Sequence, residues 1–402
     1  MHPKMTRKTL AAYALLVAAP WPIFLTLYEV YTPTLRSSLA YAAVLSLAAA
    51  LLFFSEYGRI ILFTIYAIFV SQPIIAHFLV LDFHTLPPHL STIKKNNVDL
   101  LPGLDAVFTV ATDSYGFRSN TPGAYRAKYK VFMVGGSTTE QIAQDNSKTT
   151  AALLERGIGN PDYSVINTGL SGLRTINHIA TIDFISKFKP SLVIVQLGIN
   201  DWDCALADKC ISSPMDPRNW PISKAAFSVT NLLRSHGAWW SSFDLPALMG
   251  HYEEKKKVEL PESKIAAALQ GFGRDFAKLL QTCETIAPAT CIITTQPTGY
   301  TAENFADPQY RERLWMTPPF QYWALTEGSL IRVAAAYNNY IRNNTECKNC
   351  LLFDLEKLMH GDRQYIFDDV HFTNEGTKFF AERLLDFMRT KGLVKQEIVR
   401  TN

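Results

Sequence analysis

Charged side chains are missing from three stretches near the N-terminus of this 402-residue sequence, although they are frequent after residue 94. Residues 9–28, 37–54 and 60–81 contain no Asp, Glu, Lys or Arg. A bilayer core about 30 Å thick needs roughly 20 helical residues, so the first and third stretches are long enough to span it and the second is near the lower limit. We therefore expect a transmembrane anchor of three helices in residues 1–82, followed by a soluble part.

A large excess of one charge is missing as well. The sequence has 39 Lys and Arg against 36 Asp and Glu, a formal net charge of +3. This balance gives no reason to expect a nucleic-acid partner, because nucleic acids are bound by strongly basic surfaces.

The cations at the N-terminus set the expected orientation of the anchor. Lys4, Arg7 and Lys8 precede the first apolar stretch, and such residues are retained on the cytoplasmic side. An odd number of spans then delivers the soluble part to the periplasmic, or extracytoplasmic, side of the inner cell membrane, whereas failure of the second span would return it to the cytoplasm. A cleaved signal peptide is the alternative for the first stretch, but that stretch is too long and two more follow it.

All six cysteines lie in the soluble part, in couples that are close in sequence. Such usage suits an oxidising compartment and favours local disulfides. The spacing of Cys347 and Cys350 also fits a zinc half-site or a redox pair, but a second CxxC motif or a suitably spaced histidine pair is missing. The expected disulfides are Cys204–Cys210, Cys283–Cys291 and Cys347–Cys350.

The soluble part begins with residues 83–129, which are rich in Pro, His and Asn and predict a linker and lead-in segment. In residues 130–402, short apolar runs alternate with longer helical patterns. The predicted strands cover residues 130–134, 164–167, 192–197, 291–295 and 351–354. The predicted helices cover residues 138–156, 174–188, 265–286, 325–342 and 374–390. Continuous apolar strands separated by helices indicate a three-layer α/β/α domain around a parallel sheet.

Two long inserts follow the third and fourth predicted strands, at residues 202–263 and 297–323. They leave the sheet at the carboxyl ends of the strands, where the site of such a sheet is built. The inserts contain six of the seven tryptophans. These tryptophans fit a wall that stacks on sugars or binds an acyl chain, but packing within the inserts or contact with the membrane interface explains them equally well.

A candidate nucleophile stands directly after the first predicted strand. In Gly135-Gly136-Ser137, two glycines permit a tight turn that leaves the serine at a helix start, near backbone N–H groups without partners. Alone, this pattern also fits a helix cap or a phosphate-binding turn. However, the next two strands also end in polar turns, one with Gly172 and one with Asn200. If these strands are neighbours, the three turns combine a nucleophile with an oxyanion pocket.

A candidate base and its carboxylate partner lie between the last predicted strand and the last helix. Asp368 and His371 are three residues apart, so one short loop can present both side chains. From this loop alone, a structural role for His371 in a turn before the helix is equally plausible. His178 lies near the Gly172 turn, but it falls in a helical pattern without a carboxylate nearby, and we expect it at the surface or behind the site.

Together these four blocks resemble those of the SGNH, or GDSL-type, hydrolase superfamily, over residues 130–390. The resemblance implies a flavodoxin-like fold with five parallel strands, a catalytic triad and an oxyanion hole. The implied triad is Ser137, Asp368 and His371, and the implied oxyanion hole is formed by Ser137, Gly172 and Asn200.

Two features refine this resemblance. The lead-in with Pro102-Gly103 and residues 115–118 is similar to that of membrane-tethered bacterial members. Gly136 and Thr138 replace the Asp and Leu of the GDSL signature. The substrates of the better-studied lipases therefore do not transfer to this chain.

The expected function is hydrolysis of an O-acyl ester, such as an O-acetyl ester, on a cell-envelope glycan or lipid, with no cofactor and no metal. Anchoring suits an immobile or membrane-bound substrate, so the expected partners are the acylated substrate and the bilayer. Acyl transfer to or from a glycan is an alternative that uses the same triad but requires an acceptor hydroxyl to outcompete water. A non-catalytic envelope assembly factor is a further alternative, against which the intact catalytic positions argue.

Overall fold

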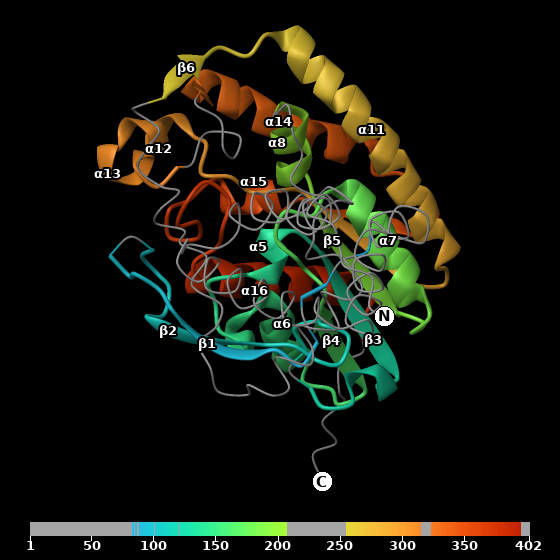
Figure 1. Ribbon diagram of the computed structural model, residues 1–402. Coiled ribbons are helices and arrows are strands. Elements are labelled where there is room, and N and C mark those ends of the chain that lie inside the picture. The colour runs from blue at the N-terminus through green and yellow to red at the C-terminus, as the bar shows by residue number, and fades with distance from the viewer. Residues whose placement is uncertain are drawn as a thin grey trace, which may run out of the picture. The chain divides into compact units, whose positions relative to one another are not determined.

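The computed structural model describes residues 83, 85–86, 88–99, 101–119, 121–206, 255–314 and 323–394. Its largest sheet has five parallel strands in the order β4-β3-β5-β7-β9 (Figure 1). Counted along the chain from β3, this order is 2-1-3-4-5, which is that of a flavodoxin-like sheet. The α/β class and the parallel sheet predicted from the sequence are therefore confirmed.

The strands of this sheet are short and apolar, and alternate side chains point to its two faces. Val131 and Met133 of β3 enter one core, whereas Phe132 and Val134 enter the other. The sheet is thus buried on both faces, which explains why its strands are continuously apolar. The strands are β3 (Tyr129–Gly135), β4 (Tyr163–Asn167), β5 (Leu192–Gln196), β7 (Thr290–Thr294) and β9 (Cys350–Phe353).

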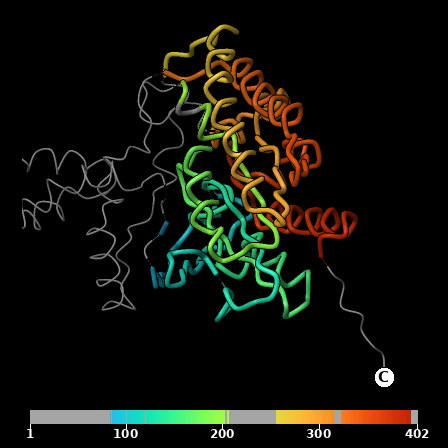
Figure 2. The backbone as a smooth tube through the Cα atoms, turned by 90° about the vertical axis from the view of Figure 1, so that its right-hand side faces the viewer, coloured from blue at the N-terminus to red at the C-terminus, as the bar shows by residue number. Residues whose placement is uncertain are grey.

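Helices cover both faces of the sheet. One core is closed by α6 (Thr150–Ile158), α15 (Leu355–Met359) and α16 (Asn374–Thr390). The other is closed by α7 (Thr175–Ser186), α11 (Glu262–Thr285) and α14 (Glu327–Asn344). Figures 1 and 2 show α11 running beside α14 on its side of the sheet, away from α16. The observed arrangement is the three-layer α/β/α architecture.

The predicted helix over residues 138–156 is wrong, because this segment forms two helices. α5 (Ser137–Glu140) ends at Gln141, which has a left-handed backbone with φ of 58°. The Arg118 guanidinium donates to the carbonyl oxygens of Glu140 and Gln141. Carbonyl groups that would continue a helix are thus bound by a side chain distant in sequence, which helical periodicity does not reveal.

Residues 83–129 contain more regular structure than a linker. β1 (Ser91–Lys95) pairs with β2 (Val107–Ala111) in an antiparallel hairpin. The hairpin is attached to the loop after α5, since Thr109 N donates to Asp145 Oδ2 at 2.9 Å. The lead-in is therefore part of the folded domain and carries Arg118 to the site. Two short 3-10 helices follow the hairpin along the chain, η1 (Ala124–Arg126) and η2 (Asn146–Lys148).

The two inserts meet in a small second sheet, where β6 (Lys256–Val258) pairs in parallel with β8 (Trp323–Leu325). The first insert begins within α8 (Ile199–Leu206), directly after β5. The second insert contains α12 (Ala302–Ala306) and α13 (Pro308–Arg311). Four of the insert tryptophans lie outside the described residues, namely Trp220, Trp239, Trp240 and Trp315.

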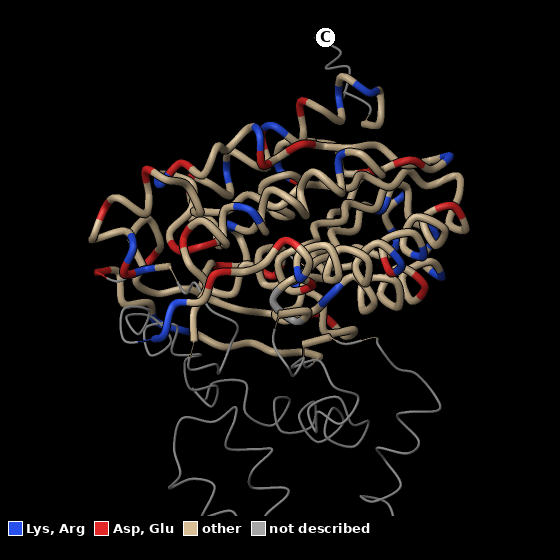
Figure 3. The backbone as a smooth tube through the Cα atoms, turned by 90° about the horizontal axis from the view of Figure 1, so that it is seen from above, with Lys and Arg blue, Asp and Glu red and all other residues tan. Residues whose placement is uncertain are grey.

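The predicted membrane anchor lies outside the described residues. Among the helices that are described, none is long and apolar enough to cross a bilayer. Cationic and anionic residues are interspersed along these described elements (Figure 3).

The cysteines follow the predicted pairing only in part. Cys347 and Cys350 form a disulfide at the start of β9. The predicted Cys283–Cys291 disulfide is wrong, because both residues are buried free thiols. The hydrogen bond that the Cys291 thiol shares with Cys283 and burial in the apolar core raise the pKa of Cys291, which favours the protonated thiol over the thiolate that oxidation requires. The predicted Cys204–Cys210 pair lies outside the residues whose side chains are described.

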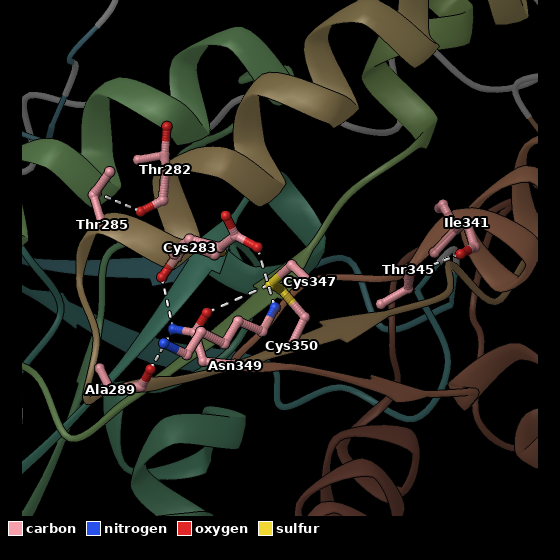
Figure 4. The surroundings of a disulfide bond; sticks show 11 residues. Thr282, Cys283, Thr285, Ala289, Ile341, Thr345, Cys347, Asn349 and Cys350 are labelled. Carbon is pink, nitrogen blue, oxygen red and sulfur yellow. Dashed lines mark hydrogen bonds between the residues drawn. A yellow bond between two sulfur atoms is a disulfide. The ribbon is translucent and has the colours of Figure 1, made fainter.

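The disulfide closes a turn that ties two elements together. Figure 4 shows Asn349 inside this turn, with its amide directed at two backbone carbonyls. Asn349 Nδ2 donates to Cys283 O at 2.7 Å and to Ala289 O at 2.6 Å. The turn thereby joins the end of α11 to the start of β7.

Candidate active site

The serine turn needs glycine at two positions. A Cβ on Gly135 would lie 2.1 Å from Thr139 Oγ1, and a Cβ on Gly136 would lie 2.5 Å from Asn200 Nδ2. Both distances are below contact distance, so glycine is what lets the strand end, α5 and Asn200 approach one another. The Asn200 amide fills the space that a side chain at position 136 would need. Ser137 follows as the first residue of α5.

A hydrogen-bonded chain joins Ser137, His371 and Asp368. Ser137 Oγ lies 2.8 Å from His371 Nε2, and His371 Nδ1 lies 2.6 Å from Asp368 Oδ2. Asp368 is 0% exposed. Its other oxygen, Oδ1, accepts from the backbone N–H groups of Val370 and His371 at 2.9 and 2.7 Å. Both carboxylate oxygens are occupied, so the orientation of Asp368 is fixed.

His371 has the electrostatic surroundings of a base. Burial alone would lower its pKa, but the charge of Asp368 and its hydrogen bond outweigh burial, so that the pKa of His371 is raised. An imidazole whose Nδ1 faces a carboxylate carries its proton on that nitrogen. Nε2 is then an acceptor for the Ser137 hydroxyl, and the raised pKa strengthens it as a proton acceptor.

Asp369 is hydrogen-bonded to the second insert and not to His371 among the described contacts. Its Oδ2 accepts from the Tyr300 hydroxyl at 2.8 Å, and its Oδ1 has no hydrogen-bond partner within the described part of the chain. Burial, followed by the neighbouring charge of Asp368, raises the pKa of Asp369 to about 7. Asp368 is thus the aspartate that faces His371. Sequence patterns do not single out Tyr300, whose link to this loop spans 69 residues.

The turns after β4 and β5 lie against the serine turn. Asn200 Nδ2 donates to Leu173 O at 2.8 Å, and the Cβ position of Gly136 approaches both groups. Gly172 is exposed and has a left-handed backbone with φ of 79°. No described acceptor receives its N–H. The structure therefore brings Asn200 and Leu173, the residue after Gly172, against Gly136, the residue before Ser137.

A small cleft touches Ser137 and His371. It has a volume of about 10 Å³, which is room for a group about the size of a water molecule. Its apolar walls are Ile142, Phe367 and Phe372.

A larger groove of about 850 Å³ lies among α8, α11 and the β6–β8 sheet. It is lined by Arg174 and Asp201, which are next in the chain to Leu173 and Asn200. The rest of the lining combines Trp323, Phe272 and other apolar side chains with several charged ones. The groove thus begins at residues that adjoin the two turns beside Ser137.

Within the described residues, one group of three neighbouring side chains has the ligand types for a metal. The ligand atoms of Asp368, Asp369 and His371 all lie within 4.8 Å of one another. His371 Nδ1 and Asp368 Oδ2 are 2.6 Å apart, a hydrogen-bond distance, whereas two ligands of one tetrahedral zinc ion lie about 3.3 Å apart. This cluster is therefore arranged for sharing a proton.

The ionisable residues His178, Arg118 and Glu140 are also buried. His178 is 1% exposed, so the surface position is excluded and the position behind the site stays a prediction, and burial lowers its pKa to about 3. Arg118 is 1% exposed and Glu140 is 7% exposed. Sequence patterns place Arg118 only in the lead-in and give Glu140 no role. The available signal for Glu140 is its position three residues after Ser137 in a helix start.

The chain belongs to the GDSL-like lipase/acylhydrolase family, which matches residues 133–379. Membership of this family makes it an ester hydrolase. No curated protein matches the sequence.

Several solved structures are similar to this chain. An acetyl xylan esterase, AlAXEase, shares 16% identity and a TM-score of 0.36, over 64% of this chain and 98% of its own. TesA shares 14% identity and a TM-score of 0.35, over 65% and 98%. The lipase/acylhydrolase from Enterococcus faecalis shares 17% identity and a TM-score of 0.36, over 67% and 98%. At these identities the likenesses carry no information on the substrate of this chain.

Proposed function

We propose that the chain is a membrane-anchored serine esterase that hydrolyses a short O-acyl ester on a cell-envelope glycan or lipid. The observation that carries the proposal is the hydrogen-bonded chain from Ser137 through His371 to the buried Asp368. It supplies a nucleophile, a base and a carboxylate that orients the base.

In the proposed reaction, His371 Nε2 accepts the proton of Ser137 Oγ while Oγ attacks the carbonyl carbon of the ester. Negative charge then develops on the carbonyl oxygen, toward which Ser137 N–H, Gly172 N–H and the Asn200 amide donate. Loss of one such donor typically costs roughly 3 kcal/mol. Asp368 stabilises the imidazolium of His371, which protonates the alcohol oxygen as the ester C–O bond breaks. The acyl group stays bound to Ser137 Oγ. Water, deprotonated by His371, releases the carboxylic acid.

The small cleft supports a short acyl group. Among the described residues, the cleft beside Ser137 has a volume of about 10 Å³, which is room for about one water molecule. The methyl group of an acetyl ester is near this limit, whereas a fatty acyl chain would need a long apolar channel. We therefore propose an O-acetyl ester as the preferred substrate.

The larger groove supports a glycan as the alcohol part of the ester. In this groove of about 850 Å³, Trp323 offers an aromatic ring, and Lys256, Arg274 and Asp275 offer hydrogen-bonding groups. Such a combination of aromatic and polar groups suits a sugar chain.

The proposed location is the extracytoplasmic side of the cell membrane. Three charge-free stretches and the cationic N-terminus support a multi-pass anchor. The Cys347–Cys350 disulfide supports an oxidising compartment. A C-terminal reporter that is active only in the cytoplasm, together with a free Cys347 thiol in intact cells, would contradict this location.

The function is tested on the full chain in detergent. We expect hydrolysis of p-nitrophenyl esters to fall steeply from acetyl to octanoyl, and Ser137→Ala to abolish it. Acetylated envelope glycans should then release acetate, with and without an acceptor glycan. Acetyl transfer without acetate release would identify a transferase, and an intact glycan in both reactions would contradict the proposed substrate.

A further inference from the structure

One side chain links the helix of Ser137 to the turn that carries Gly172. Glu140 is the last residue of α5, and its side chain is directed at the turn after β4. Its Oε2 accepts from the backbone N–H and from Oγ of Ser171, each at 2.6 Å. Ser171 immediately precedes Gly172. Hydrogen bonds to a buried carboxylate are charge-assisted and short, so Glu140 fixes the position of this turn.

The backbone of Glu140 is itself held in place. Arg118 Nη1 donates to Glu140 O at 2.5 Å and to Gln141 O at 2.8 Å. Arg118 is anchored through its own backbone, whose N–H donates to Asn167 O at the end of β4 at 3.0 Å. Because α5 has only four residues, its end carbonyl groups need partners from outside the helix. Arg118 supplies them and keeps Glu140 from shifting.

The start of the same turn lies directly on α5. Asn167 Nδ2 donates to Thr139 O at 2.6 Å. A Cβ on Gly169 would lie 2.3 Å from Glu140 N, so the two backbones are in contact there. Three residues later, the left-handed Gly172 has a Cβ position with nothing within 4 Å. Packing therefore fixes the start of the turn. The Glu140–Ser171 bonds hold its exposed tip on the side before Gly172, and the bond from Asn200 Nδ2 to Leu173 O holds the side after it.

We infer that Glu140 is a positioning residue that aims the Gly172 N–H at the oxyanion formed beside Ser137. The inference rests on the proposed esterase function. An interaction that strengthens only in the transition state changes kcat rather than KM. Removing an oxyanion donor lowers kcat by about 10²- to 10³-fold, so displacing one should lower kcat by about 10- to 100-fold.

The test compares Glu140→Ala with wild type on p-nitrophenyl acetate, using the full chain. We expect kcat about 10- to 100-fold lower with KM within about twofold. A trifluoromethyl ketone, which forms an oxyanion on a nucleophilic serine, should bind more weakly by the same factor as kcat. Glu140→Gln keeps an acceptor oxygen for Ser171 and should restore most of kcat.

Glu155 provides a matched control. Like Glu140, it is a carboxylate that accepts from a backbone N–H, but its donor is Val165 in the middle of β4, at 2.6 Å, and not the turn after that strand. Glu155→Ala should lower the melting temperature and leave kcat within about twofold. Equal losses of kcat in the two alanine variants would mean that both act through folding, which would overturn the inference.

The remaining outcomes distinguish the positioning role of Glu140 from the proposed esterase function. Full activity of Ser137→Ala would refute the proposed function itself. An inactive Ser137→Ala beside a fully active, folded Glu140→Ala would refute the positioning role alone. If Glu140→Ala does not fold, Ser171→Ala at its exposed position removes the Oγ bond only. A kcat several-fold lower at constant KM then supports the inference, and an unchanged kcat overturns it.

Discussion

Replacing Asp368 with Asn should turn the His371 imidazole into the wrong tautomer. Asp368 Oδ1 accepts from two backbone N–H groups, at 2.9 and 2.7 Å. An asparagine amide must keep its oxygen there, because its NH₂ would otherwise face two donors. The NH₂ group then faces His371 Nδ1, which becomes an acceptor and moves the imidazole proton to Nε2. Nε2 can then no longer accept the Ser137 proton.

The expected loss in kcat approaches about 10⁴-fold, which corresponds to about 5.4 kcal/mol in the activation barrier. Asp369→Asn is the matched control, because it changes the adjacent aspartate in the same way. Its Oδ2 accepts only from Tyr300, and an amide oxygen can replace it, so the loss should stay within about tenfold. Both are measured as kcat on p-nitrophenyl acetate, with folding checked by thermal melting. Equal losses, or a greater loss in Asp369→Asn, would refute the reasoning.

Three further predictions concern pH, the serine turn and the disulfide. Activity needs neutral His371, whose pKa is lowered by burial but raised by the charges of Asp368 and Asp369, with a net increase. In a pH–rate profile, kcat/KM should therefore fall as the pH drops through this raised pKa. The midpoint of the fall should lie at lower pH in Asp369→Asn, which lacks one of the two charges. Gly136→Ala puts a Cβ 2.5 Å from Asn200 Nδ2 and should lower kcat at least about tenfold by displacing an oxyanion donor; an unchanged kcat would speak against the role of Asn200. Joint replacement of Cys347 and Cys350 by Ser should lower the free energy of unfolding, measured in urea, by about 2 kcal/mol, which is the loop-closure entropy of so short a loop. The kcat from steady-state kinetics should be unchanged.

The sheet could be predicted from the sequence because each of its strands is a local signal. Residues 192–196 are a continuous apolar run that ends in Gln, and they form β5. The helix predicted at 374–390 has the same bounds as α16, since Thr373 caps its start by accepting from Gly376 N. The helix predicted at 138–156 fails because its end depends on Arg118, which comes from a separate segment. Local periodicity carries no information on such a contact.

In the site too, residues in local motifs could be predicted, whereas contacts between distant segments could not. Ser137, Asp368 and His371 stand in short motifs, so their types and spacing can be recognised in the sequence. The bond from Glu140 to Ser171 spans 31 residues, and the bond from Tyr300 to Asp369 spans 69. Both depend on which loops the sheet order brings together. The paired β6 and β8 show the same limit, because two separate inserts build one small sheet.

The most direct test of the central claim is the site at which the protein reacts with a fluorophosphonate. Such a probe phosphonylates a serine that is activated by a neighbouring base. After labelling of the full chain, peptide mass spectrometry should find the adduct on Ser137, and Ser137→Ala and His371→Ala should both remain unlabelled. An adduct on another residue, or ester hydrolysis by a protein that shows no adduct, would contradict Ser137 as the nucleophile.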